Sequence, residues 1–288
     1  MVTKLLSLMP DHQKYIEIFG GGASLLFAKK PTEFEVYNDL DSGLISFFRV
    51  LRDPDKFAKF YHWVSLTPYS REEYYDCRNT WETENDPIMK AYKWFVVAGQ
   101  SFAGRFGSGW GFNVNRSYNG KVACVSGWQG CISQLHAVHQ RMMDVQIEHN
   151  DFRQIIKTYE SADCLFYFDP PYPHQTRTPI YYQIEMSDSD HEDLLQLIIA
   201  TPAMVMLSSY PNDLYNETLI GWNKIEFHTA CHAAGRTRNS KLQGKGNALK
   251  YQSRIEVVWR NPAMMKQIEN GNTNINGRND PSILWAEG

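Results

Sequence analysis

Short apolar segments rich in β-branched and aromatic residues alternate with helix-like stretches, and this alternation constrains the fold more than any other feature. The segments are YIEIFG (15–20), FEVYND (34–39), VQIEHND (145–151), CLFYFD (164–169) and AMVMLSS (203–209). GASLLFAKK follows the first, and SDSDHEDLLQLIIA precedes the fifth, with Ser187 or Ser189 as a candidate N-cap. The sequence therefore predicts an α/β sheet with parallel strands. KIEFHTA (224–230) and RIEVVWR (254–260) have no helical pattern between them and predict an antiparallel pair.

The alternation is interrupted between about Asp53 and Asp144. The stretches PYSREEYYDCRNTWETEND and IMKAYKWFVVAGQSF are helix-like and aromatic, and GRFGSGWGFNVNRSYNGK is glycine-rich. We expect residues 1–52 and 145–262 to form the α/β domain and residues 53–144 to form an inserted, mostly helical subdomain. After one short helical turn that follows Asn261, the Asn- and Gly-rich end of the chain, residues 263–288, is expected to be a flexible tail.

Composition excludes several classes of protein. The chain is 43% hydrophobic and 21% charged, as in ordinary globular proteins, and no run of about 18 apolar residues predicts a membrane span. Five scattered cysteines without a CxxC pair favour neither a disulfide framework nor a zinc site, so a reducing cytoplasm is expected. His136 and His139 are spaced for a helix surface, and without a third ligand we expect no metal there.

Two strand ends suggest a nucleoside-binding site. The first strand runs into EIFGGGASLLF, where three glycines before a helix let backbone N–H groups approach a ligand. The second ends in YNDLD about twenty residues later, where an acid in a doubly wound fold binds ribose hydroxyls. Asp39 is the candidate for that role, and Asp41 is expected to be a helix N-cap.

The sequence Asp169-Pro170-Pro171-Tyr172 follows a fully apolar strand. Ligands of open α/β sheets bind at the carboxyl ends of the strands. The two prolines fix φ and remove two N–H donors, which leaves a rigid set of acceptors beside an aromatic ring. This set suits a planar ligand with an exocyclic amino group.

These motifs resemble those of the Dam-like DNA N6-adenine methyltransferases, which use S-adenosylmethionine. EIFGGGAS, FEVYNDLDSGLISFFRVLRD, SFAGRFGSGWGFNV, DPPY and RIEVVWRNP carry the resemblance, which covers nearly the whole chain from Leu5 to Pro262. It implies a Rossmann-like catalytic domain, mostly parallel with an antiparallel C-terminal strand, and a helical target-recognition insert. A phage or prophage source would fit it.

The resemblance also implies roles for individual residues. The cofactor-binding residues would be Glu17, Phe19, Gly20, Gly21 and Gly22 around the methionine part, Asp39 on the ribose, and Asp151 and Phe152 on the adenine. Asp169 and the Pro170 carbonyl, with Pro171, would hold the target amine, and Tyr172 would stack on an adenine flipped out of double-stranded DNA.

Two segments without acidic residues are the expected DNA contacts, although the net charge is only −3. They run from Gly99 to Lys121 and from Arg236 to Arg254. The candidate residues are Arg105, Arg116, Lys121, Arg236, Arg238, Lys241 and Lys245.

Several alternatives stay open at this stage. The family's basic Gly-Lys segment is not matched ahead of Tyr15, so either the true start lies upstream or the cofactor pocket is open on one side. A catalytically impaired DNA-binding relative is one alternative function, and methylation of cytosine N4 or of adenine in RNA is another. A cytoplasmic monomer is expected, with a dimer on DNA as the alternative. The role can be restriction–modification, phage protection or regulation.

Overall fold

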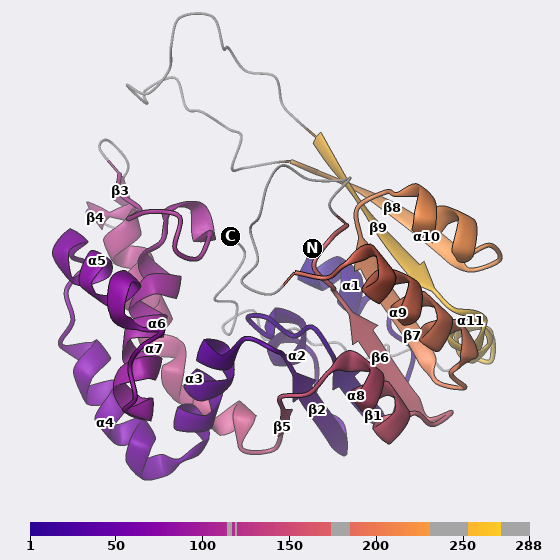
Figure 1. The fold of residues 1–288 in the computed structure, drawn as a ribbon, viewed down its shortest axis with the longest axis horizontal. Coiled ribbons are helices and arrows are strands. Elements are labelled where there is room, and N and C mark those ends of the chain that lie inside the picture. Colours follow the sequence, from indigo (N-terminus) through magenta and orange to yellow (C-terminus); the bar gives the residue numbers. More distant parts are fainter. Residues whose placement is uncertain (114–116, 119, 174–184, 231–252, 272–288) are drawn as a thin grey trace, which may run out of the picture.

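The computed structural model describes residues 1–113, 117–118, 120–173, 185–230 and 253–271. Figure 1 shows two parts side by side, a sheet flanked by helices and a lobe built almost entirely of helices. The carboxyl ends of the parallel strands and the glycine-rich end of the helical lobe point to the same side of the molecule.

The sheet has seven strands in the order β5-β2-β1-β6-β7-β9-β8. They are β1 (Lys14–Glu17), β2 (Phe34–Asn38), β5 (Gln146–Glu148), β6 (Cys164–Phe168), β7 (Met204–Ser209), β8 (Asn223–Ala230) and β9 (Ser253–Arg260). The first five are parallel, and β9 pairs antiparallel with both β7 and β8. This arrangement confirms the predicted fold class, including every expected strand and the antiparallel pair.

The strand order reverses between β1 and β6. From β1 the sheet continues to β2 and β5 on one side, and to β6 and β7 on the other. In open α/β sheets a ligand crevice forms at such a switch point, outside the carboxyl ends of the strands. The glycine turn after β1 and the Asp-Pro-Pro-Tyr segment after β6 are therefore neighbours, since Glu17 pairs with Tyr167 in register.

Successive residues of the central strands point into two different hydrophobic cores. Tyr15 packs with the helical lobe and with α1 (Val2–Leu6) and α2 (Ser24–Ala28), whereas Ile16 packs with α8 (Phe152–Tyr159) and α9 (Asp188–Ala200). Both are completely buried. Because both faces of the sheet are covered, its strands read as continuous apolar runs rather than as alternating ones.

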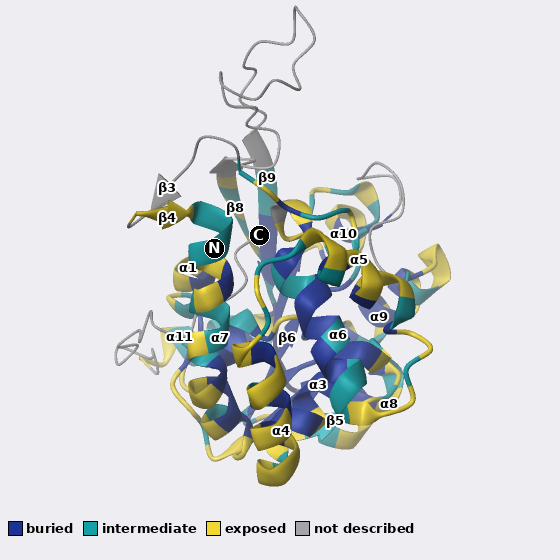
Figure 2. Ribbon diagram, turned by 90° about the vertical axis from the view of Figure 1, so that its left-hand side faces the viewer, coloured by how far each residue is buried: buried dark blue, intermediate teal, exposed yellow. Residues whose placement is uncertain are grey.

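The helical lobe follows β2. It contains α3 (Ser42–Arg52), α4 (Pro54–Ser65), α5 (Arg71–Thr80), α6 (Pro87–Gln100), the short η1 (Phe102–Gly104), the hairpin β3 (Ser117–Tyr118) and β4 (Lys121–Val122), and α7 (Ala123–Met142). The helix α3 packs closely on α6, and Figure 2 shows both as largely buried. Although α3 precedes the expected boundary at residue 53, it therefore contributes to the core of this lobe.

Local capping chemistry sets where these helices begin. Asp41 accepts hydrogen bonds from the N–H groups of Gly43 and Leu44, as expected for the N-cap of α3. Ser187, rather than Ser189, is the N-cap of α9 and forms a capping box with Asp190.

Two details differ from the sequence-based expectations. His139 is not on a helix surface: its ring lies 4.5 Å from that of Phe57, and its Nδ1 is hydrogen-bonded to the Leu51 carbonyl. The short helical turn expected after Asn261 is a longer helix, α11 (Pro262–Glu269), which buries Met264. Residues 272–288 lie outside the described part. The remaining helix is α10 (Asp213–Thr218).

Candidate active site

The glycine turn after β1 is fixed by the end of β2. The Gly20 N–H donates to the Asn38 carbonyl at 3.0 Å, and the Tyr37 hydroxyl donates to the Gly21 carbonyl at 2.7 Å. A Cβ atom on Gly20 would lie 2.1 Å from Cε2 of Tyr37, and Gly21 has a φ of +48°. Close approach therefore requires glycine at position 20, and a left-handed backbone favours it at position 21.

Asp39 joins this turn to the start of α3. One carboxylate oxygen accepts the Gly21 N–H at 2.8 Å, and the other accepts the Asp41 N–H at 2.8 Å. Burial raises the pKa of Asp39, and the two backbone hydrogen bonds oppose this rise. The side chain predicted to bind a ribose thus also determines the shape of the glycine turn.

Asn38 connects three strand ends, which the sequence analysis did not anticipate. Its amide nitrogen donates to the carbonyls of Ile18 and Asn150, both at 3.0 Å, and its amide oxygen accepts the Asn150 N–H at 2.9 Å. The side chain is 2% exposed. Its position beside Asp39 at the end of an apolar strand was the only available signal.

Glu17 is a buried carboxyl group at the same edge of the sheet. It is 2% exposed and accepts a hydrogen bond of 2.7 Å from the Tyr15 hydroxyl. Burial raises the pKa of Glu17 to about 8, and the nearby charge of Asp169 adds to this rise. A cationic ligand at this edge would favour the charged form of Glu17.

Asp169 lies immediately beyond the five buried residues of β6. Its Oδ1 accepts a hydrogen bond of 3.1 Å from the Tyr172 hydroxyl. Loss of hydration in its dense surroundings raises the pKa of Asp169 to about 7. The side chain is nevertheless exposed to solvent, which limits this loss and leaves the carboxylate accessible to a ligand.

The aromatic ring of this motif has a partner from the next strand. The Tyr172 ring centroid lies 4.3 Å from that of Tyr210, which follows β7, with an interplanar angle of 58°. Pro170 is buried and Pro171 is half-buried. Tyr210 was not predicted, because nothing in the segment around it resembles a motif.

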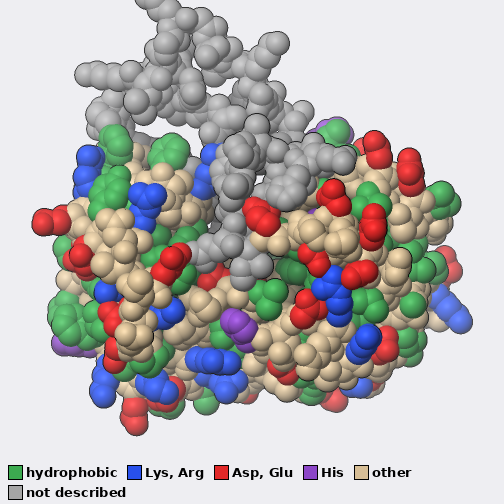
Figure 3. Space-filling view, viewed as in Figure 1, with side chains coloured by type: hydrophobic (Ala, Val, Ile, Leu, Met, Phe, Trp, Pro, Cys, Tyr) green, Lys and Arg blue, Asp and Glu red, His purple; other side chains and the backbone are tan. Residues whose placement is uncertain are grey.

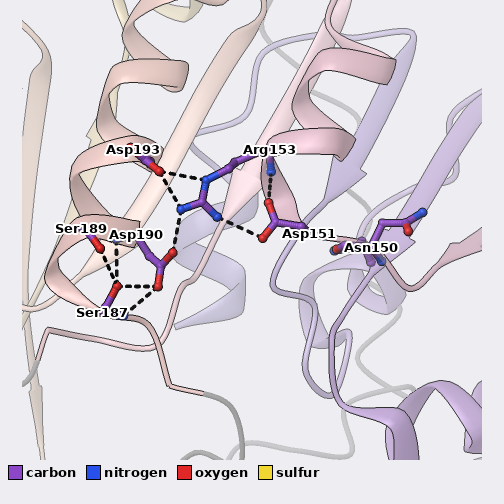
Figure 4. Close-up of polar contacts among 8 residues, drawn as sticks. Asn150, Asp151, Arg153, Ser187, Ser189, Asp190 and Asp193 are labelled. Atoms are coloured by element: carbon purple, nitrogen blue, oxygen red, sulfur yellow. Dashed lines mark hydrogen bonds and ion pairs between the residues drawn. The ribbon is translucent and has the colours of Figure 1, made fainter.

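Asp151 and Phe152 begin α8 at the end of β5. Asp151 is the N-cap of this helix, and one of its carboxylate oxygens accepts the backbone N–H of Arg153. The other oxygen forms an ion pair with the Arg153 guanidinium at 3.0 Å. Figure 4 shows that the Arg153 guanidinium also reaches Asp190 and Asp193 of α9, at 2.6 and 2.7 Å. This network joins the amino termini of α8 and α9.

Two aromatic rings line the apolar side of this region. Phe152 is 4% exposed, and its ring centroid lies 5.8 Å from that of Phe19, which follows β1. Phe19 in turn lies 6.5 Å from Phe168 of β6. The structure thus brings the candidate residues of β1, β2, β5 and β6 to one edge of the sheet, but the Phe152 ring belongs mainly to the core.

The predicted DNA contacts are only partly described. Arg105 is exposed after η1, and Lys121 of β4 is exposed and donates to Gln129 at 2.7 Å. Both are in the helical lobe. Arg116, Arg236, Arg238, Lys241 and Lys245 lie outside the described residues.

The described ranges contain no group of three or more His, Cys, Asp or Glu side chains that could hold a metal ion. None of their helices is long and apolar enough to cross a membrane.

Comparisons with known proteins agree with the geometry. Residues 1–220 match the family of D12 class N6 adenine-specific DNA methyltransferases. The chain is similar to the type II methyltransferase M.MjaIII of Methanocaldococcus jannaschii, with 26% identity over 235 residues, or 73% of this chain and 78% of the relative. It is also similar to the type II methyltransferase M1.LlaDCHI of Lactococcus lactis subsp. cremoris, with 27% identity over 261 residues, or 83% and 85%.

Proposed function

Because the chain belongs to the D12 class of N6 adenine-specific DNA methyltransferases and therefore methylates adenine in DNA, we propose that the sheet edge around β1 and β6 is its active site. The observation that carries this proposal is the meeting of two motifs at the switch point of the sheet. Asp39 clamps the glycine turn at the end of β2, and Asp169 and Tyr172 extend from the end of β6 beside it.

S-adenosylmethionine fits the chemistry of this edge. It has a cationic sulfonium and a cationic amino group, and the edge presents three carboxyl groups whose pKa values are raised: Glu17, Asp39 and Asp169. A cation offsets the repulsion and lost hydration that raise these values. When bound, S-adenosylmethionine supplies the electrophilic methyl group.

Residues on both sides of the switch point would hold this cofactor. The Gly20–Gly22 turn and Glu17 would surround the methionine part, and Asp39 would accept hydrogen bonds from the ribose hydroxyls. Each Asp39 oxygen has a second lone pair beyond its backbone hydrogen bond. Asp151, with the edge of the Phe152 ring, would contact the adenine.

The residues that follow β6 would orient the target base. The adenine amino group would donate one hydrogen bond to Asp169 and one to the Pro170 carbonyl, and its ring would stack on Tyr172. These acceptors stabilise the positive charge that develops on N6 as the N–CH3 bond forms and the S–CH3 bond breaks. The exposed carboxylate of Asp169 would also receive the proton that N6 then loses.

Access to N6 requires the adenine to leave the duplex. Stacking on an aromatic ring offsets part of the cost of unpairing the base. Arg105 and Lys121 of the helical lobe, with Arg116 and the basic segment 236–245, would contact the DNA backbone. We assign residues 53–144 to target recognition, and residues 1–52 and 145–262 to catalysis.

The alternatives are less well supported. The family match specifies adenine in DNA, which does not favour a cytosine or an RNA substrate. A DNA-binding relative without activity is not favoured either, since the glycine turn and the Asp169–Tyr172 pair are both formed. The two type II relatives support a role in restriction–modification.

Substitution of Asp169 tests the proposed mechanism. Asp169→Ala should abolish methylation of duplex DNA while leaving DNA affinity, measured by fluorescence anisotropy, largely unchanged. The matched control is Asp163→Ala, since Asp163 lies just before the amino end of β6, away from the candidate site, and forms a solvent-accessible salt bridge with Lys14. Retained methylation in Asp169→Ala would refute the assigned role of this carboxylate.

A second experiment tests the cofactor independently. Calorimetric titration of the wild-type chain with S-adenosylmethionine should show binding, and Asp39→Ala should weaken it. No binding with or without duplex DNA would refute the proposed pocket.

A further inference from the structure

The glycine-rich segment that follows α6 is held in a defined shape by side chains of neighbouring elements. The Tyr69 hydroxyl donates to the Gly111 carbonyl at 2.6 Å, and Ser101 accepts the Gly107 N–H at 2.9 Å. Ser101 also forms an isolated β-bridge with Trp110. Three glycines of this segment have positive φ angles: Gly104, Gly107 and Gly109. The backbone of the segment therefore has a defined conformation, and its side chains form a surface before any ligand binds.

Arg71, at the first position of α5, lies against two aromatic rings of this surface. Its guanidinium carbon is 4.9 Å from the ring centroid of Trp110 and 5.4 Å from that of Phe112. The two rings are stacked, with centroids 6.0 Å apart and an interplanar angle of 14°. The Trp110 Nε1 donates to Gln100 at 3.2 Å, which fixes the indole. We call Arg71, Trp110 and Phe112 the arginine platform.

Arg71 and Phe112 of the platform are exposed, and Trp110 is half-buried. No carboxylate among the described residues forms a salt bridge with Arg71, and Phe112 is 47% exposed. A cation at the start of a helix interacts unfavourably with the helix dipole, so the charge of Arg71 does not stabilise α5. Residues 99–121 contain no acidic side chain.

The platform lies on the side of the molecule where a duplex would approach the active site. Figure 1 places the β3–β4 hairpin, which follows Trp110 and Phe112 in the chain, at the end of the helical lobe that points the same way as the carboxyl ends of the parallel strands. In Figure 3, basic and hydrophobic side chains are interspersed at this end of the lobe. A duplex that reached Asp169 from this side could therefore also meet the platform.

We propose that the arginine platform binds a backbone phosphate of the DNA substrate. The inference rests on the proposed function, because it takes the duplex at the β1–β6 edge as its ligand. Stacking through the face of the guanidinium leaves its N–H edge available, and this planar fork matches two phosphate oxygens. The aromatic rings hold the fork in place before DNA arrives, which reduces the entropy lost on binding.

Duplex binding over a range of sodium chloride concentrations tests the proposal. A fluorescein-labelled duplex is the probe, and Arg71→Gln should weaken binding about tenfold and reduce the salt slope by about one, as for one lost phosphate contact. Arg71→Lys keeps the charge but loses the planar fork, so it should recover the salt slope and only part of the affinity. Phe112→Leu should weaken binding with an unchanged slope.

Arg52→Gln is the matched control. Arg52 is also exposed and belongs to the same lobe, but it ends α3, which runs back from the carboxyl edge of the sheet. Its substitution should leave affinity and slope unchanged. Equal effects of Arg52→Gln and Arg71→Gln would overturn the proposal, and so would a fully functional Arg71→Gln or Arg71→Lys.

Failure of this inference can be distinguished from failure of the proposed active site. Arg71 lies against Trp110 and Phe112 in the helical lobe and not at the sheet edge, so Arg71→Gln should bind S-adenosylmethionine normally and methylate at the wild-type rate at saturating DNA. A slower rate at saturation would contradict a pure binding role. A wild-type chain that binds duplex through Arg71 but never methylates would refute the active site alone.

Discussion

Glu17 offers a direct test of whether the sheet edge is as strongly desolvated as the structure indicates. Glu17→Gln keeps the size of the side chain and an oxygen that accepts the Tyr15 hydroxyl, but it removes the charge. In the wild type, the pKa of Glu17 is raised from 4.5 to about 8. The folded state therefore retains a proton that the unfolded chain releases.

The sign of the effect follows from this difference in proton binding. Between pH 4.5 and about 8, the unfolded wild type loses its proton while the folded wild type keeps it, so stability falls as the pH rises. The loss approaches about 1.4 kcal/mol per pH unit, or about 5 kcal/mol in total as an upper value. Glu17→Gln has no ionisable group at this position, so its unfolding free energy does not fall in this way. Its stability relative to the wild type should therefore increase with pH over the same interval.

The assay is urea denaturation of both proteins at several pH values, with the difference in unfolding free energy as the readout. We expect the advantage of Glu17→Gln to grow by about 2 kcal/mol between pH 5.5 and 7.5. Glu33→Gln, at an exposed position, should show a difference within about 0.5 kcal/mol at every pH. A pH-independent difference for Glu17→Gln would refute the reasoning, because it would mean that Glu17 is not desolvated.

Two further substitutions address the geometry of the edge. Gly20→Ala forces Tyr37 to move and should cost about 1–3 kcal/mol and weaken S-adenosylmethionine binding, whereas Gly21→Ala meets no neighbour and should cost only about 1–2 kcal/mol of backbone strain. A Gly20→Ala variant as stable as the wild type in urea would contradict the close approach at Gly20. Asn38→Ala removes three hydrogen bonds and should cost about 2–4 kcal/mol in the same assay, with a larger calorimetric Kd for the cofactor. A loss below about 0.5 kcal/mol would show that water replaces these bonds.

Much of the fold could be predicted from the sequence because its signals are local. Each of the seven strands overlaps a segment that the sequence predicts as a strand, and β6 is buried at all five positions, as its unbroken apolar sequence indicates. The N-cap role of Asp41 was predictable for the same reason, since a cap depends on residues two or three positions away. The Asp169–Tyr172 motif also carries its own rigidity in its two prolines.

The rest was decided by contacts between distant parts of the chain. Asn38 bonds to Asn150, which lies 112 residues further along the chain, and the Leu51 carbonyl that holds His139 lies 88 residues before it. The spacing of His136 and His139 predicted that both lie on a helix surface. This is correct for His136, which is exposed, but wrong for His139, because Phe57 of α4 covers its ring.

The sequence by itself thus determined the elements, their order and the residues at their ends. Only the tertiary structure decided which of these ends meet, because a local pattern records whether a side chain is buried but not which partner buries it. Arg71 illustrates this limit. In the sequence it is one of several charged residues of α5, and only the fold places the rings of Trp110 and Phe112 against its guanidinium.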